Sequence, residues 1–165
     1  MSERYGVNGV AIACYPMYQG ISRLLGMAVY PTPKSIEEEF QALHTCYSEY
    51  DFFFVHIKDT DSRGEDRNFA AKVKAIERTD ALVPQILALE PDVIAVTADH
   101  STPAAYGAHS WHPVPAMLWS RYCRGGSTPK FDEYHCAQGT LGRQPAKYLM
   151  TQMLANAGRL NKFGA

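Results

Sequence analysis

Three short apolar segments, separated by stretches with helical periodicity, constrain the fold of this chain most strongly. Residues 9–15, 51–57 and 92–97 are rich in β-branched or aromatic side chains and have the length of buried strands. Between these segments, apolar residues recur at helical spacing over residues 35–50 and 67–89. Strands that alternate with helices indicate a parallel sheet, because each parallel strand is reached through a helix-length crossover. We therefore predict an α/β fold, with a mostly parallel sheet flanked by helices.

Local sequence signals indicate where several elements begin. Ser35 and Glu38 have the spacing of a capping box, which starts a helix by satisfying free backbone N–H groups. Asp66 is expected to cap the helix over residues 67–89, and Pro84 to kink it.

Further elements are predicted on both sides of these segments. A short helix is expected after Pro16, and a short strand over residues 28–30. A strand over residues 113–119 begins with proline, which is typical of a sheet edge or a bulge. A helix over residues 144–157 closes the predicted set.

Composition narrows the class of protein. The chain has 165 residues and a net charge of −1, so we expect a single domain over residues 1–165 and no nucleic-acid or membrane partner. The apolar stretches are far shorter than the ~20 residues that span a membrane, and residues 1–5 are polar, unlike a secretory signal. Four cysteines without a C-x-x-C spacing predict free thiols and a cytoplasmic protein.

The residues best suited to chemistry follow the strand at 92–97. Asp99 and His100 are adjacent, and His109 and His112 follow a short loop later. Ligands and metals bind beyond the carboxyl ends of strands in open α/β sheets, and carboxylates and imidazoles are ligands of Zn²⁺ and Mn²⁺. The spacing alone fits two interpretations equally well: a metal site, or a turn capped by Asp99 with His100 packed in a loop.

A second polar segment, KDTDSRGEDRN, follows the strand at 51–57. We expect it to be a loop at the carboxyl end of that strand. Its acidic residues either bind a ligand or are solvated and cap the next helix.

The motifs TADHSTP and HSWHPVP resemble the metal-binding segment of the alkaline phosphatase superfamily. More closely, they resemble the archaeal-type 2,3-bisphosphoglycerate-independent phosphoglycerate mutases, which read D-H-S/P-T-P and then H-S/T followed by D-P-V-P. The segment FAAKVKAIERTDALVPQIL, the motif LGR and the ending KFGA are also similar to that family. The chain resembles the carboxyl-terminal part of such an enzyme, which implies a partial alkaline-phosphatase-like domain.

The resemblance implies two divalent metal ions, either Mn²⁺, Mg²⁺ or Zn²⁺. Asp99 and His100 match the ligands of one ion, and Asp61 and His109 match ligands of the other. Glu65 stands where the family has His in a D-x-x-G-H segment. A carboxylate also binds metals, and it favours a harder ion such as Mn²⁺ or Mg²⁺ over Zn²⁺.

Three other positions bear on the implied site. Arg143 in the LGR motif either contacts a substrate phosphate, which a guanidinium group suits, or forms a structural salt bridge. His112 stands where the family usually has Asp, so it would support the ligands at most. Gln19 replaces a lysine that is usual in the family and that would stabilise the charge of a transferred phosphoryl group.

The activity implied by the resemblance is the interconversion of 3-phosphoglycerate and 2-phosphoglycerate through a phosphoserine enzyme. In the family, the nucleophilic serine, the first Asp ligand and a substrate-binding insertion precede the region that this chain resembles. We therefore expect the isolated chain to be inactive. Because a sheet cut along an edge exposes backbone groups, we also expect a homo-oligomer or a complementary chain.

Two alternatives remain at this point. The first alternative is a catalytically inactive metal-binding or assembly module derived from that family, and Gln19 and Glu65 favour it. The other alternative, a different phosphomonoester hydrolase of the superfamily, is disfavoured by the DHSTP, PVP, LGR and KFGA segments.

Overall fold

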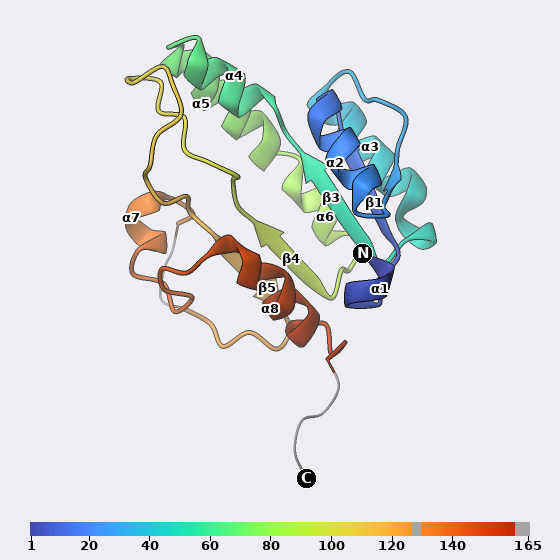
Figure 1. The fold of residues 1–165 in the computed structure, drawn as a ribbon. Coiled ribbons are helices and arrows are strands. Elements are labelled where there is room, and N and C mark those ends of the chain that lie inside the picture. Colours follow the sequence, from blue (N-terminus) through green and yellow to red (C-terminus); the bar gives the residue numbers. More distant parts are fainter. Residues whose placement is uncertain (127–129, 161–165) are drawn as a thin grey trace. The chain divides into compact units, whose positions relative to one another are not determined.

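The computed structural model describes residues 1–126 and 130–160 (Figure 1). It divides into two compact units. The first unit holds residues 1–90 and 102–108, and the second holds residues 91–101 and 109–165. The ending KFGA, one of the segments behind the predicted resemblance, lies outside the described residues.

A parallel sheet of three strands forms the centre of the first unit. The strands are β1 (Gly9–Ala13), β2 (Ala28–Val29) and β3 (Phe52–His56). Their order is β2-β1-β3, and both pairings are parallel. Each strand begins within the segment in which the sequence predicts one, so the predicted α/β class with a parallel sheet is confirmed.

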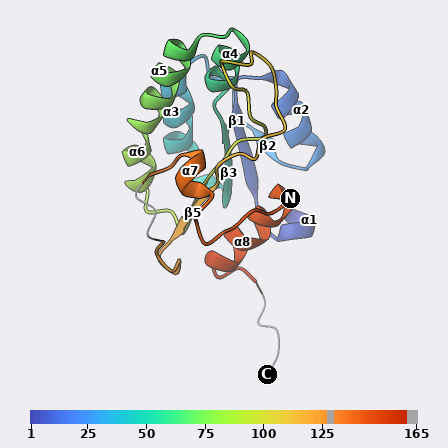
Figure 2. The same cartoon turned by 90° about the vertical axis from the view of Figure 1, so that its left-hand side faces the viewer.

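Helices flank this sheet on both faces. They are α1 (Ser2–Tyr5), α2 (Pro16–Leu24), α3 (Ile36–Cys46), η1 (Tyr47–Glu49), α4 (Asp59–Glu65), α5 (Phe69–Asp80) and α6 (Val83–Leu87). Figure 2 shows α2 on one face of the sheet, and α3, α5 and α6 on the other.

Side chains alternate between these two faces, as the pleat of a strand requires. On one face, Val10 and Ile12 pack with buried residues of α3 such as Leu43, and Phe53 packs against the same cluster. On the other face, the ring of Tyr18 in α2 lies 5.9 Å from that of Phe54. Fully burying a side chain such as Ile12 contributes roughly 1.5–3 kcal/mol, so this double-sided packing stabilises the sheet.

The predicted helix start at Ser35 is confirmed. The Ser35 hydroxyl accepts a hydrogen bond from the Glu38 N–H at 3.2 Å. The Glu38 carboxylate accepts from the Lys34 N–H at 2.7 Å, one residue ahead of the N–H used in a standard capping box.

Two predictions about residues 58–89 are wrong. The polar segment after β3 is the helix α4, not a loop, and Asn68 rather than Asp66 caps α5 by accepting from the Ala71 N–H. The long helix predicted over residues 67–89 is two helices, with a break after Asp80. Pro84 explains the break, because it has no N–H for the carbonyl of Asp80 and its ring clashes with that carbonyl in a continuous helix.

The second unit contains the antiparallel strands β4 (Val93–Val96) and β5 (Met117–Ser120), in which Val93 pairs with Ser120. Its helices are α7 (Glu133–Cys136), η2 (Ala146–Tyr148) and α8 (Leu149–Asn156). The strand predicted over 113–119 begins later, at Met117, because Pro113 and Pro115 have no N–H to donate to a partner strand. In both units, none of the helices in the described ranges is long and apolar enough to cross a membrane.

Candidate metal centre

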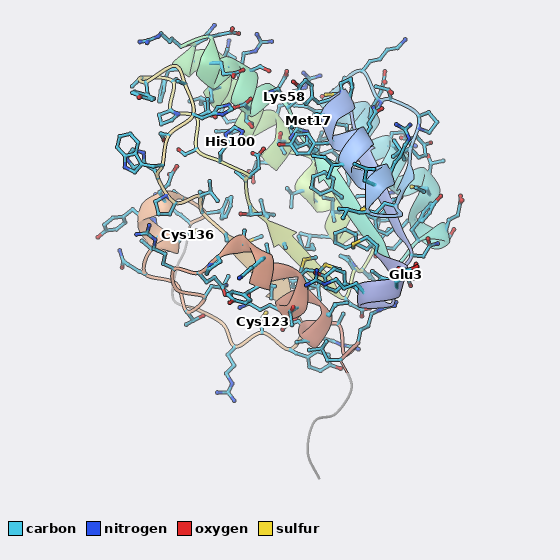
Figure 3. All side chains as sticks on the ribbon, viewed as in Figure 1. Glu3, Met17, Lys58, His100, Cys123 and Cys136 are labelled. Atoms are coloured by element: carbon cyan, nitrogen blue, oxygen red, sulfur yellow. The ribbon has the colours of Figure 1, made fainter. Side chains whose placement is uncertain are left out.

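His100 and His109 lie side by side in the second unit. Their ring centroids are 3.7 Å apart, and the ring planes meet at 30°. Figure 3 labels His100 on the segment that follows β4. An isolated antiparallel bridge between Ser101 and Ser110, with the Ser110 N–H donating to the Ser101 carbonyl at 2.9 Å, brings the two histidines together. One ring nitrogen of each lies within 4.8 Å of the other, so the pair offers two imidazole donors to one region of space.

Asp99 lies next to this pair. Its Oδ1 accepts the backbone N–H of His100 at 3.0 Å, and its Oδ2 is 3.3 Å from His100 Nε2. The two side chains are 42% and 30% exposed, and a contact this open to solvent contributes little to folding. The sequence left open either a turn capped by Asp99 or a metal site. The structure shows features of both: Asp99 accepts the His100 N–H, and two histidines lie beside it.

His112 is held by the same loop. Its Nδ1 lies 2.9 Å from the Ser110 hydroxyl, and its ring stacks on that of Trp111 with centroids 5.1 Å apart. His112 therefore contacts the residue that forms the bridge beneath the histidine pair.

Asp61 belongs to the first unit and lies on α4. Its Oδ1 accepts a hydrogen bond from the Thr102 hydroxyl at 2.5 Å, and its Oδ2 forms an ion pair with Lys58. The Asp61 side chain is only 13% exposed. Hydrogen bonds to a carboxylate fix the direction of its oxygens, as they do for metal ligands in proteins.

Glu65 ends α4, four residues after Asp61, so the two carboxylates occupy the same face of that helix. Both carboxylates raise the pKa of the Lys58 ammonium. Its partial burial lowers its pKa, but the hydrogen bond to Asp61 and the charges of Asp61 and Glu65 outweigh burial and raise the pKa above its ordinary value. Lys58 therefore remains a cation beside the two carboxylates.

The surroundings of Asp61 include three residues to which the sequence alone assigned no role: Thr102, Lys72 and Gly64. The Lys72 ammonium donates to the Thr102 carbonyl at 2.6 Å. A Cβ on Gly64 would lie 2.3 Å from that same carbonyl oxygen, so only glycine allows α4 and Thr102 to approach this closely. The signals were available, because Thr102 belongs to the DHSTP motif and Gly64 to the D-x-x-G motif.

Gln19 and Arg143 have different environments. The Gln19 amide is 9% exposed and donates to the Ala13 carbonyl at 2.8 Å and to the Thr32 hydroxyl at 3.0 Å. Gln19 therefore ties α2 to the end of β1. Arg143 is exposed on the segment between α7 and η2 of the second unit.

Comparison with known proteins identifies the class to which this fold and these donors belong. The profile of the metalloenzyme superfamily matches residues 1–156, and the chain belongs to that superfamily. Membership of this superfamily implies the use of divalent metal ions, and the carboxylates and imidazoles described above are chemically suitable ligands.

Its relatives define the type more narrowly. The chain is 52% identical over 163 residues to a probable 2,3-bisphosphoglycerate-independent phosphoglycerate mutase of Thermotoga neapolitana, covering 99% of this chain and 41% of the relative. It is 51% identical over 166 residues to the Aquifex aeolicus protein of the same name, covering 100% of this chain and 41% of that protein. The predicted resemblance to these mutases is confirmed, and the chain spans about two fifths of their length.

Two solved structures share the fold. A Pyrococcus horikoshii protein matches with a TM-score of 0.93 and 31% identity, over 99% of this chain and 53% of that one. The cofactor-independent phosphoglycerate mutase of Thermoplasma acidophilum matches with a TM-score of 0.77 and 25% identity, over 95% of this chain and 38% of that one. The fold is therefore that of part of a phosphoglycerate mutase of the cofactor-independent, alkaline-phosphatase-like type.

Proposed function

We propose that this chain is the metal-binding, carboxyl-terminal part of a cytoplasmic cofactor-independent phosphoglycerate mutase, which interconverts 3-phosphoglycerate and 2-phosphoglycerate. The observation that carries this proposal is the stacked pair His100–His109 beside Asp99. Such a cluster of exposed donors contributes little to folding, and it occurs in a chain whose relatives are named as these mutases.

We assign Asp99 and His100 to one divalent ion, and Asp61, His109 and Glu65 to the other. The resemblance supports the second set, because Asp61 and His109 match ligand positions of the mutase family. When bound, two such ions would clamp the attacking and leaving oxygens of the transferred phosphoryl group.

The surrounding residues prepare these ligands. Thr102 and Lys58 each contact one oxygen of Asp61 and so fix the orientation of its carboxylate. The bridge between Ser101 and Ser110 sets the separation of the two imidazoles. Glu65 adds a carboxylate in place of an imidazole, so we expect a preference for Mn²⁺ or Mg²⁺ over Zn²⁺.

The full reaction requires groups that we place outside this chain. The nucleophilic serine and the remaining ligand belong, on this proposal, to the three fifths of the relatives' length that the chain does not match. A complementary chain that holds this unmatched part would supply them, and the isolated chain would not turn over phosphoglycerate. Exposed Arg143 is the residue we assign to the substrate phosphate, because its guanidinium fork suits phosphate oxygens.

Calorimetric titration of the metal-stripped chain with Mn²⁺ and Zn²⁺ tests the ligand assignment. We expect binding that is lost in the double variant Asp99→Ala, His100→Ala. The matched control is Asp132→Ala with His135→Ala, which removes another Asp–His pair of the second unit, one with a 2.7 Å contact. Absent binding, or binding that both double variants retain, would contradict the proposal.

The second candidate function is an inactive metal-binding or assembly module of the same family. Gln19 favours it, because this side chain is committed to structural hydrogen bonds where the family usually has a lysine. The discriminating measurement is mutase turnover after co-expression with the unmatched part of the Thermotoga maritima relative, which is 50% identical to this chain over the shared part. Metal binding without turnover in a formed complex would support the module.

A further inference from the structure

The helix α2 has an unusual distribution of side chains. Met17, Ile21 and Leu24 follow the spacing i, i+4 and i+7, so they share one side of the helix, and Leu25, the residue that caps its carboxyl end, comes next. All four are exposed, at 50%, 45%, 88% and 52% respectively. Figure 3 labels Met17 at the amino-terminal end of this helix. We call these four residues the α2 apolar face.

Polar side chains occupy the buried side of the same helix. Gln19 is 9% exposed and Ser22 is 3% exposed. A surface helix normally turns its apolar stripe toward the core and its polar residues toward water. Tyr18 of α2 packs on Phe54, but the four exposed apolar side chains add little to the stability of this unit, because their surfaces remain hydrated. Contiguous exposed apolar residues of this kind mark interaction surfaces.

Two observations indicate the occupant of this face. The chain spans 41% of its curated relative from Thermotoga neapolitana, so most of the relative's polypeptide has no counterpart here. The Met1 amino group donates a hydrogen bond to the Leu25 carbonyl, which places residue 1 at one end of the α2 apolar face. Polypeptide that joined the chain ahead of residue 1 would emerge beside that face.

We propose that the α2 apolar face is the docking surface for the polypeptide that corresponds to the unmatched part of the mutase relatives. This inference rests on the proposed function, since it names where the complementary part binds. The occupant presents an apolar surface, because charged groups facing Ile21 and Leu24 would lose their hydration without a partner. Methionine is enriched in such interfaces, and Met17 is 50% exposed on this face.

Co-expression tests the proposal. The full chain, carrying an affinity tag, is produced together with the unmatched part of the Thermotoga maritima relative, and complex formation is measured by co-purification and light scattering. The test variant is Ile21→Glu with Leu24→Glu. The matched control is Ile76→Glu on α5, since Ile76 is exposed to a similar extent, 50%, in the same unit. We expect the test variant to reduce the recovered complex at least about ten-fold and the control to leave it unchanged.

The other outcomes separate the possible failures. Folding is checked by circular dichroism and by the milder variant Leu24→Ser, which alters a side chain that is 88% exposed. Self-association that the same glutamates abolish would overturn the proposal in favour of a second copy. No complex, or a complex indifferent to the glutamates, would overturn it outright. Complex formation is measured with and without Mn²⁺. A complex that forms but binds no metal would contradict the proposed metal site and leave the docking proposal standing.

Discussion

The Thr102 hydroxyl donates a hydrogen bond to Asp61 Oδ1 at 2.5 Å, although 41 residues separate the two positions in the sequence. The Thr102 carbonyl is held as well, by the Lys72 ammonium at 2.6 Å. One residue thus joins the segment 102–108 to the helices α4 and α5 at the carboxylate that we assign to a metal ion.

Replacing Thr102 with valine tests whether this bond prepares Asp61 for a ligand. Valine keeps the shape of the side chain and removes the hydroxyl, so Asp61 loses one of the groups that orient it. We expect Mn²⁺ affinity, measured by calorimetry, to fall roughly 10-fold to 100-fold. The control is Thr45→Val, because the Thr45 hydroxyl donates within α3, to the Gln41 carbonyl. Equal losses in both variants would contradict the role given to Thr102.

A pair of glycine variants tests the close approach of α4 to Thr102. In Gly64→Ala, the new Cβ would lie 2.3 Å from a backbone carbonyl oxygen, which cannot move aside cheaply. We expect the free energy of unfolding, measured in urea, to fall by roughly 1–3 kcal/mol. In Gly20→Ala, on α2, the new Cβ would meet no atom of the described residues within 4 Å beyond its chain neighbours and the backbone of its own helix, so we expect a gain of about 0.5–1 kcal/mol. Loss of stability in both variants would show that the contact at Thr102 is not the cause.

Gln19 offers a third test, of its structural role. Gln19→Leu leaves the Ala13 carbonyl buried without its donor, and such a loss costs about 1–3 kcal/mol. The comparison variant is Gln41→Leu on α3, where the side chain is exposed and we expect a change within about 0.5 kcal/mol. If both variants unfold at the same urea concentration as the unmodified chain, Gln19 does not hold α2 to β1.

The strands and several helices could be predicted from the sequence because local signals determine them. The run from Gly9 to Ala13 is buried at every position, and Ser35 caps α3 as its spacing to Glu38 predicts. In these segments, local propensity and tertiary packing favour the same structure.

The helix α4 could not be predicted in the same way. Its sequence, DTDSRGE, has no apolar periodicity, and a helix this short is marginal in water. The contacts that accompany it are tertiary: the Thr102 hydroxyl on Asp61 and the Thr102 carbonyl against Gly64. These contacts come from a segment some 40 residues away in the sequence, so no local pattern reveals them.

The candidate site was predictable in composition but not in arrangement. Its residue types and their place after strands indicate metal ligands, and the family resemblance names Asp61, Asp99, His100 and His109. That His109 stacks on His100 depends on the bridge between Ser101 and Ser110, which the spacing of the histidines does not specify.

Glu39 provides the last prediction, because it is an ionisable side chain in the interior of the first unit. It is 3% exposed and lies on α3, at a cavity of about 120 Å³ that Cys14, Lys34 and Asp59 also line. Burial raises the pKa of Glu39 from its ordinary value of 4.5 to about 8. A hydrogen bond from the Cys14 N–H opposes this shift and the charge of Asp59 adds to it.

The consequence is a stability that falls as pH rises. Between pH 4.5 and 8 the unfolded chain has released the Glu39 proton and the folded chain retains it, so higher pH favours unfolding. The loss is at most about 1.4 kcal/mol per pH unit, and it ends above the folded pKa. Urea unfolding from pH 5 to pH 9 measures it. Glu39→Gln, which cannot ionise, should remove this slope and exceed the unmodified chain in stability at pH 8.

Glu37 supplies the matched control for Glu39. It lies on the same helix, but its hydrogen bond with Arg78 lowers its pKa below the ordinary value, so it is ionised in both states above pH 5. Glu37→Gln should therefore leave the slope between pH 5 and 8 unchanged. If Glu39→Gln retained the slope, another group would carry it, and Glu39 would be ionised inside the fold beside Lys34 and Lys58.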